Sequence, residues 1–180
     1  MTDRPRFIYA YAEMAQVADD VRRKRAEDDP AMVEAGRMTA DTAAYRLRIS
    51  TAIAVDWRAF AIGELPPVDH YTTDVEKLAR LQVAHAGAVK RREQAEAAMI
   101  VEYGPAIALL SLSKLWAIHD AHDTRSMRIL PYLRWESYAA ALEGMIWWQE
   151  RPRYQSRRFI TMINQELRAF GYVEQPRVAA

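Results

Sequence analysis

The chain has 180 residues, of which 51% are hydrophobic and 27% are charged, and its 25 Lys and Arg residues against 24 Asp and Glu residues give a net charge of +1. This apolar content excludes a disordered chain, and the near-neutral charge gives no overall field that would attract nucleic acid or an anionic membrane. The absence of cysteine excludes a disulfide framework, cysteine-ligated zinc and a cysteine nucleophile.

The most apolar stretch of the sequence, residues 106–118, is interrupted by Ser111, Ser113 and Lys114. It is shorter than the ~20 residues that a transmembrane helix needs. The first residues also lack the apolar core and small-residue cleavage site of a signal peptide. We therefore expect a soluble, cytoplasmic protein without a membrane partner, folded as a single domain over residues 1–180.

Residues 1–63 are expected to form an N-terminal helical hairpin subregion. Apolar residues at steps of three and four over residues 7–21 indicate the buried face of a first helix. Pro30 suits the first turn of a short second helix that ends at Gly36, because its missing N–H is not needed there. Thr39 is a good N-cap for a long third helix. The buried side of that helix is expected to carry Ile49, Ile53, Trp57 and Phe60.

Residues 64–72 are the best candidate linker, because two adjacent prolines favour an extended segment. Thr72 or Thr73 can cap a further long helix that reaches about Tyr103. The remaining helices, over residues 73–171, are expected to form a C-terminal helical bundle subregion.

Residues 105–118 follow a break at Gly104 and are apolar on almost every side. A helix without a polar face must be enclosed by protein, so we predict that this segment is the buried central helix of the bundle. With the cavity term included, Leu109→Ala or Leu112→Ala is then expected to cost ~2–5 kcal/mol of stability.

A polar loop over residues 119–128 precedes a helix over about residues 131–149, and a last helix runs from Ser156 to Gly171. No alternating segment is long enough to predict a sheet. The predicted fold class is therefore all-α, a bundle of about six helices in which the N-terminal hairpin packs on a C-terminal bundle with a buried central helix.

A histidine–aspartate pattern is the first candidate for chemistry. His85 lies within a predicted helix, and His119-Asp120 ends the predicted central helix after Leu-Trp-Ala-Ile. Residues 80–123 thereby resemble the HD-domain metal phosphohydrolases, an all-helical family in which such residues bind a divalent metal that activates water. The resemblance implies His85, His119 and Asp120 as the metal ligands of a degenerate HD-like phosphohydrolase.

The chain departs from the HD pattern downstream of these residues. The family has a further Asp ligand on a distant helix, whereas Asp123 is the last Asp of this chain and lies too close. The residues that could replace it are Glu136, Glu143 and Glu166. Without a metal, His85 is a core histidine with satisfied hydrogen bonds and His119 is a favourable cation at a helix C-terminus.

Two further patterns use the same residues. Arg80 and His85 have the Arg-x4-His spacing of the HEPN ribonucleases, which are also all-helical, and this resemblance implies phosphate polarisation and proton transfer at a symmetric dimer interface. His119 and His122 lie three residues apart and could chelate a metal with Asp120 and Asp123. Chance spacing is the stronger explanation of the first pattern, and a polar loop at a helix C-terminus explains the second without a metal, so no cofactor is favoured.

The C-terminal third is basic and aromatic, since residues 124–180 carry nine basic and five acidic side chains. On the last predicted helix, Arg158, Thr161, Gln165 and Arg168 share one side that we expect to face solvent. Arginine and aromatic side chains suit phosphates, stacked bases or a protein hot spot. The predicted contact surface consists of Trp148, Arg151, Arg153, Arg157 and Arg158. The alternative is a solvated helix face with core tryptophans.

Two segments carry a second resemblance, Val33-Glu34-Ala35-Gly36-Arg37-Met38-Thr39-Ala40 and Ile53-Ala54-Val55-Asp56-Trp57. Through them, residues 13–60 resemble short helical proteins of unknown function from alphaproteobacterial phages and prophages. The resemblance implies a mobile-element setting and no site residues.

The favoured function is non-enzymatic: a phage- or prophage-type accessory protein, such as an antidefence factor, that binds a host protein, a nucleoprotein complex or nucleic acid. The HD-like phosphohydrolase and the HEPN-like ribonuclease are the enzymatic alternatives, and a homodimer is compatible with each of these functions.

Overall fold

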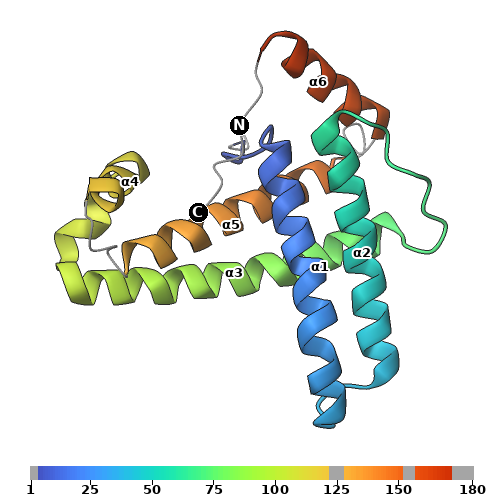
Figure 1. Cartoon of the computed structure of the whole chain (residues 1–180), viewed down its shortest axis with the longest axis horizontal. Coiled ribbons are helices and arrows are strands. Elements are labelled where there is room, and N and C mark those ends of the chain that lie inside the picture. The colour runs from blue at the N-terminus through green and yellow to red at the C-terminus, as the bar shows by residue number, and fades with distance from the viewer. Residues whose placement is uncertain (1–3, 122–127, 152–156, 172–180) are drawn as a thin grey trace. The chain divides into compact units, whose positions relative to one another are not determined.

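The computed structural model describes residues 4–121, 128–151 and 157–171, and the side chains of residues 157–159 are not included in that description. The described residues form helices and no strands, which confirms the predicted all-α class (Figure 1). The elements, in chain order, are α1 (Tyr11–Glu34), α2 (Ala40–Ile62), α3 (Asp74–Tyr103), the 3₁₀ helix η1 (Pro105–Leu109), α4 (Leu112–Ala121), α5 (Ile129–Gln149) and α6 (Arg157–Ala169). No helix in this part of the chain is long and apolar enough to cross a membrane.

Helix α1 is a single helix that runs through Pro30, so the prediction of a separate short helix beginning there is wrong. Proline removes one intrahelical hydrogen bond, the one to the carbonyl four residues earlier, at Ala26. Both Ala26 and Pro30 are exposed, so water can satisfy that carbonyl and the helix continues. It ends one turn later, where Gly36 adopts a left-handed φ of 67°.

Helix α2 begins and ends where the sequence predicts. The Thr39 hydroxyl accepts a hydrogen bond from Thr42 N at 3.2 Å, which makes Thr39 the N-cap. Gly63 closes the helix with a φ of 75°, and Glu64 N donates to Ala59 O at 2.9 Å. The predicted buried stripe is confirmed at Ile49, Ile53, Trp57 and Phe60.

The chain divides into two compact units. The first contains residues 1–84 and 141–180, and the second contains residues 85–140. Helices α1 and α2 lie side by side and antiparallel in the first unit (Figure 1). The units therefore do not coincide with the predicted subregions 1–63 and 73–171, because the last turns of α5 and all of α6 belong with the N-terminal hairpin.

The second unit has a small core of its own, in which η1 and α4 each contribute one buried residue. The buried core residues are Met99, Ile107, Leu115, Ile129 and Leu133. The prediction of one buried central helix over residues 105–118 is wrong. Leu110 is extended, with a ψ of 144°, and so separates η1 from α4. Leu109 is 87% exposed, and the cost predicted for Leu109→Ala therefore does not apply.

Candidate functional site

An aromatic group formed by Tyr11, Trp57 and Trp148 occupies the core of the first unit. The ring centroid of Tyr11 lies 6.4 Å from that of Trp57 and 6.4 Å from that of Trp148. Trp148 Nε1 donates to Ile8 O at 2.7 Å. Trp148 is 2% exposed, so its assignment to a contact surface is wrong. Its indole N–H is satisfied by the backbone, and its ring packs in the core.

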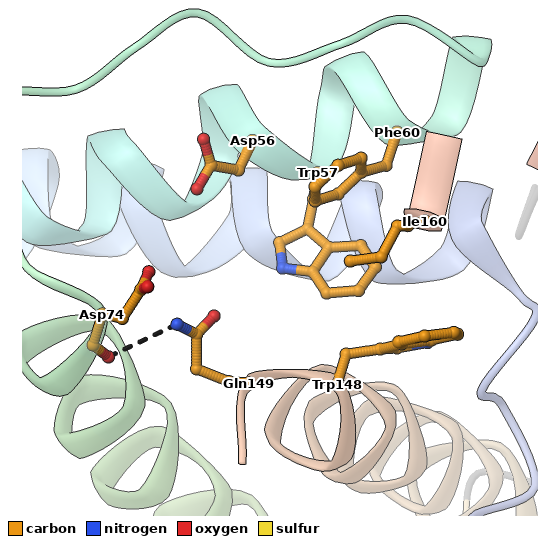
Figure 2. Close-up of a pocket in the computed structure, with 7 residues that line it drawn as sticks. All are labelled: Asp56, Trp57, Phe60, Asp74, Trp148, Gln149 and Ile160. Carbon is orange, nitrogen blue, oxygen red and sulfur yellow. Dashed lines mark hydrogen bonds between the residues drawn. The ribbon is translucent and has the colours of Figure 1, made fainter. Parts of the chain in front are cut away.

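A small hollow lies beside this aromatic group, between the aromatic rings and a polar end (Figure 2). Gln149 Nε2 donates to Asp74 O at 3.4 Å and so holds the polar end in place. The cavity volume of about 20 Å³ is room for a water molecule. Sites for small organic molecules usually have ~300 Å³ or more, so this hollow is too small to be a ligand pocket. Its lining residues are Asp56, Trp57, Phe60, Asp74, Trp148, Gln149 and Ile160.

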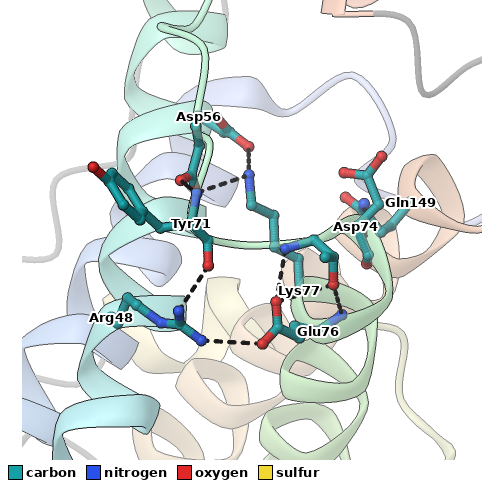
Figure 3. Close-up of polar contacts among 9 residues, drawn as sticks. Arg48, Asp56, Tyr71, Asp74, Glu76, Lys77 and Gln149 are labelled. Carbon is teal, nitrogen blue, oxygen red and sulfur yellow. Dashed lines mark hydrogen bonds and ion pairs between the residues drawn. The ribbon is translucent and has the colours of Figure 1, made fainter.

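A buried lysine is held by two carboxylates where the chain enters α3 (Figure 3). Lys77 is 1% exposed, and its Nζ lies 2.7 Å from Asp56 Oδ2 and 3.8 Å from Asp69 Oδ2. We call these three residues the Lys77 cluster. Burial alone would raise the pKa of Asp69. Hydrogen bonds from Tyr71 and Thr72, with the charge of Lys77, outweigh burial and hold the pKa below its ordinary value.

The start of α3 is secured by a capping box at Thr73, one of the two caps that the sequence predicts, and the partner Glu76 was not predicted. Thr73 Oγ1 accepts from Glu76 N at 3.2 Å, and Glu76 Oε2 accepts from Thr73 N at 2.7 Å. These hydrogen bonds from Thr73 lower the pKa of Glu76, and the charge of Arg48 acts in the same direction. Arg48 also donates to Tyr71 O at 2.7 Å, so it ties α2 to the segment before α3 (Figure 3). These polar groups therefore have structural partners.

A second buried charge cluster, not predicted from the sequence, involves α1, α2 and α3. Asp29 of α1 is 1% exposed. Arg25 NH1 lies 3.4 Å from Asp29 Oδ1, and Arg46 Nε of α2 lies 3.3 Å from Asp29 Oδ2. Arg80 of α3 is close enough for the charges of Arg25, Arg46 and Asp29 to act on it. We call these four residues the Asp29 cluster.

The signal that could have revealed this cluster lies in the helical register of α1. Met14, Ala18 and Val21 are buried on one face, and steps of four from Val21 reach Arg25 and Asp29. A run of charged residues at the end of a predicted helix is usually solvated. For this reason the sequence alone does not distinguish Arg25 and Asp29, which continue the apolar stripe, from their solvated neighbours.

Arg151 is the arginine of the predicted contact surface whose side chain the structure describes. Its guanidinium lies 4.2 Å from the ring centroid of Trp147, and its NH1 donates to Trp147 O at 3.1 Å. Arg151 and Trp147 are both half-buried at the end of α5. Arg153 lies outside the described residues, and Arg157 and Arg158 are placed only by their backbone in α6.

Helix α6 uses its predicted polar side to bond the end of α2. Three of its side chains donate to backbone carbonyls at and after the end of α2. Thr161 Oγ1 bonds Glu64 O at 3.1 Å, Gln165 Nε2 bonds Gly63 O at 2.9 Å, and Arg168 bonds Ala61 O. Asn164 also bonds Phe60 O. The last carbonyls of a helix lack intrahelical partners, so these polar residues serve as a C-terminal cap for α2. The prediction that this side faces solvent is wrong for Thr161, which is buried. Gln165 and Arg168 are exposed as predicted, and the side chain of Arg158 is not among those described.

The histidine and aspartate residues of the HD-like pattern lie in the second unit. The His119 ring packs edge-on against Trp116, with the centroids 5.9 Å apart, and Asp120 is exposed. Among the described residues, which include His85, His119 and Asp120, no three His, Asp or Glu side chains form a group that could hold a metal ion. His122 falls outside the described residues.

The Arg-x4-His pair of the HEPN-like pattern lies within α3. Residues five apart on a helix point in directions that differ by about 140°, so Arg80 and His85 lie on different faces of α3. Arg80 belongs to the Asp29 cluster. Arg80 therefore interacts with charges of its own chain, and its position on α3 does not require a dimer interface.

Comparison of the chain with models of protein families, with curated proteins and with solved structures finds no match.

Proposed function

We propose that this protein is a non-enzymatic accessory protein of phage or prophage type that binds a macromolecular partner, either a host protein with an acidic surface or a nucleoprotein complex. The proposal rests on the basic C-terminal region, and Arg151 is its anchor. The mobile-element setting comes from the resemblance of residues 13–60 to phage and prophage proteins.

The arrangement of Arg151 is the observation that carries the proposal. Stacking on Trp147 and the hydrogen bond to Trp147 O hold the guanidinium in one orientation, so little side-chain entropy remains to be lost on binding. A guanidinium has five N–H donors, and among the described residues no carboxylate forms an ion pair with Arg151. The remaining donors suit a carboxylate or phosphate of a partner.

The residues that carry the phage-type resemblance have structural roles. Ile53, Ala54 and Trp57 are buried, and Asp56 pairs with Lys77. Thr39 caps α2. A shared pattern made of such residues supports a common fold for the hairpin, while the binding residues lie elsewhere.

Quantitative capture from a host lysate, compared across variants, tests the proposal. We expect that Arg151→Ala reduces capture of a specific partner about tenfold, because an anchoring arginine typically contributes ~1.5–3 kcal/mol. Arg134→Ala, an exposed arginine of the same helix, is the matched control and should leave capture unchanged. Equal capture by wild type and Arg151→Ala would contradict the role of this anchor.

Nucleic acid is the second candidate partner, because an arginine held against a tryptophan ring also suits base stacking. Fluorescence anisotropy with a labelled single strand distinguishes this candidate. Nucleic-acid binding predicts an affinity that falls steeply and linearly on logarithmic axes as salt is raised. Absent or salt-insensitive binding favours the protein partner.

A further inference from the structure

The Asp29 cluster contains more positive charge than its carboxylate can balance. Asp29 is its single acidic residue, and its side chain is 2% exposed. Arg25 and Arg46 form ion pairs with it, and Arg80 is close enough to interact with these three charges, so the formal charge of the four residues is +2. The charges that act on Arg80 are those of Arg25, Arg46 and Asp29, and no second carboxylate is among them.

The arginines of the Asp29 cluster also have unused hydrogen-bond donors. The Nε atoms of Arg25 and Arg80 are buried and have no hydrogen-bond partner in the described part of the chain, and Arg46 Nε has only the ion pair with Asp29 Oδ2. Burial and the neighbouring charges of Arg25 and Arg46 lower the pKa of Arg80 to about 10. Burial and Arg25 likewise lower the pKa of Arg46. Both arginines are therefore destabilised in their charged forms relative to solvent.

An anion bound at this cluster would balance its surplus charge. The side chains of Arg25 and Arg46 are 24% and 21% exposed, so solvent has access to the cluster. Guanidinium groups bind tetrahedral oxyanions through pairs of parallel hydrogen bonds, and three arginines from three helices supply several such donors.

We propose that the Asp29 cluster binds a small doubly charged oxyanion of the phosphate type, either free phosphate or the phosphate of a small phosphomonoester such as a nucleotide. One such ion balances the +2 charge of the cluster. This site is separate from Arg151, and the inference does not depend on the proposed function.

Isothermal titration calorimetry with the full chain tests the site. The protein is titrated with inorganic phosphate at low ionic strength, and sodium chloride of matched ionic strength is the blank. We expect saturable binding of one phosphate per chain. Arg80→Gln should weaken binding about tenfold or more, since it removes a charge-assisted contact. The matched control Arg23→Gln, an exposed arginine of α1, should bind as the wild type does.

A second titration with a nucleoside monophosphate identifies the source of the phosphate. Tighter binding of the monophosphate than of inorganic phosphate indicates a phosphomonoester, and equal or weaker binding indicates the free ion. Arg151→Ala should retain phosphate binding, which separates this inference from the proposed function.

Two results would overturn the inference: no saturable binding by the wild type, or equal binding by wild type and Arg80→Gln. If Arg80→Gln does not fold, the melting temperature of the wild type at constant ionic strength decides instead. A rise with phosphate concentration supports the site, and an unchanged melting temperature refutes it.

Discussion

The Lys77 cluster and the Asp29 cluster lie in the same compact unit. Each has one buried ion with several ions of the opposite charge near it, and the sign of the buried ion differs between the two clusters. In each, the most deeply buried group is the minority charge. The side chains of Lys77 and Asp29 are each 2% exposed, whereas the surrounding ions keep more access to solvent. The difference lies in how the surplus charge is met.

In the Lys77 cluster, one oxygen of the second carboxylate has a hydrogen-bond partner within the chain, and the other, Asp69 Oδ2, lies 3.8 Å from Lys77 Nζ. Asp69 Oδ1 accepts a hydrogen bond from Tyr71 N at 2.8 Å, just before α3 begins. The N-terminal end of a helix also favours negative charge. The surplus positive charge of the Asp29 cluster has no such internal partner among the described residues. The comparison teaches that burial of an ionic cluster does not by itself indicate a ligand. A ligand is indicated when the ions in excess lack partners within the chain.

Removing the centre of the Lys77 cluster should have the largest effect. Lys77→Met leaves Asp56 and Asp69 without a cation, and breaking a buried pair in this way typically costs about 3 kcal/mol or more. Chemical denaturation measures the loss. Lys90→Met, an exposed position of the same helix, should change stability by less than about 0.5 kcal/mol. A small effect at Lys77 would show that its carboxylates are adequately hydrated without it.

Removing the centre of the Asp29 cluster should have a smaller effect. We expect Asp29→Asn to cost about 2 kcal/mol, since the three arginines lose their only carboxylate but keep partial access to solvent. The exposed neighbour Asp28→Asn is the control and should be nearly neutral. Added phosphate should restore part of the loss at Asp29. Equal stability of the two variants in chemical denaturation would contradict the assigned role of Asp29.

Acid should weaken the Lys77 cluster in a defined pH range. The pKa of Asp69 is lower in the folded chain than its ordinary value, so the unfolded chain binds more protons there. Its contribution to stability is therefore present above the unfolded pKa of about 4 and is lost as the pH falls through the folded pKa. Denaturation curves collected from pH 6 to pH 3 should show a flatter decline for Asp69→Asn than for the wild type. Parallel declines would mean that Asp69 does not contribute in this way.

The sequence predicted features that depend on local chemistry. The caps at Thr39 and Thr73, the end of α2 at Gly63 and the buried stripe of α2 follow from short-range rules. Features that depend on distant partners were not predictable. The pattern of α6 alone could not show that Thr161, Gln165 and Arg168 bond backbone carbonyls at the end of α2.

Apolar character did not predict burial in residues 105–118. Leu109 and Leu115 both lie in the apolar segment, yet Leu109 is 87% exposed and Leu115 is 1% exposed. The break at Leu110 between η1 and α4 changes the direction of the chain, which a continuous helical pattern could not reveal. The candidate site was similarly hidden, because Trp148 belongs to the core and Asp29 belongs to a run of charged residues.

The stability of Arg80→Gln tests the central claim most directly. If the Asp29 cluster carries unsatisfied positive charge, removing one arginine relieves repulsion. The free energy of unfolding in phosphate-free buffer at neutral pH should then stay unchanged or rise by up to about 1 kcal/mol. A loss of more than about 1 kcal/mol would show that Arg80 is a satisfied structural cation and would contradict the account.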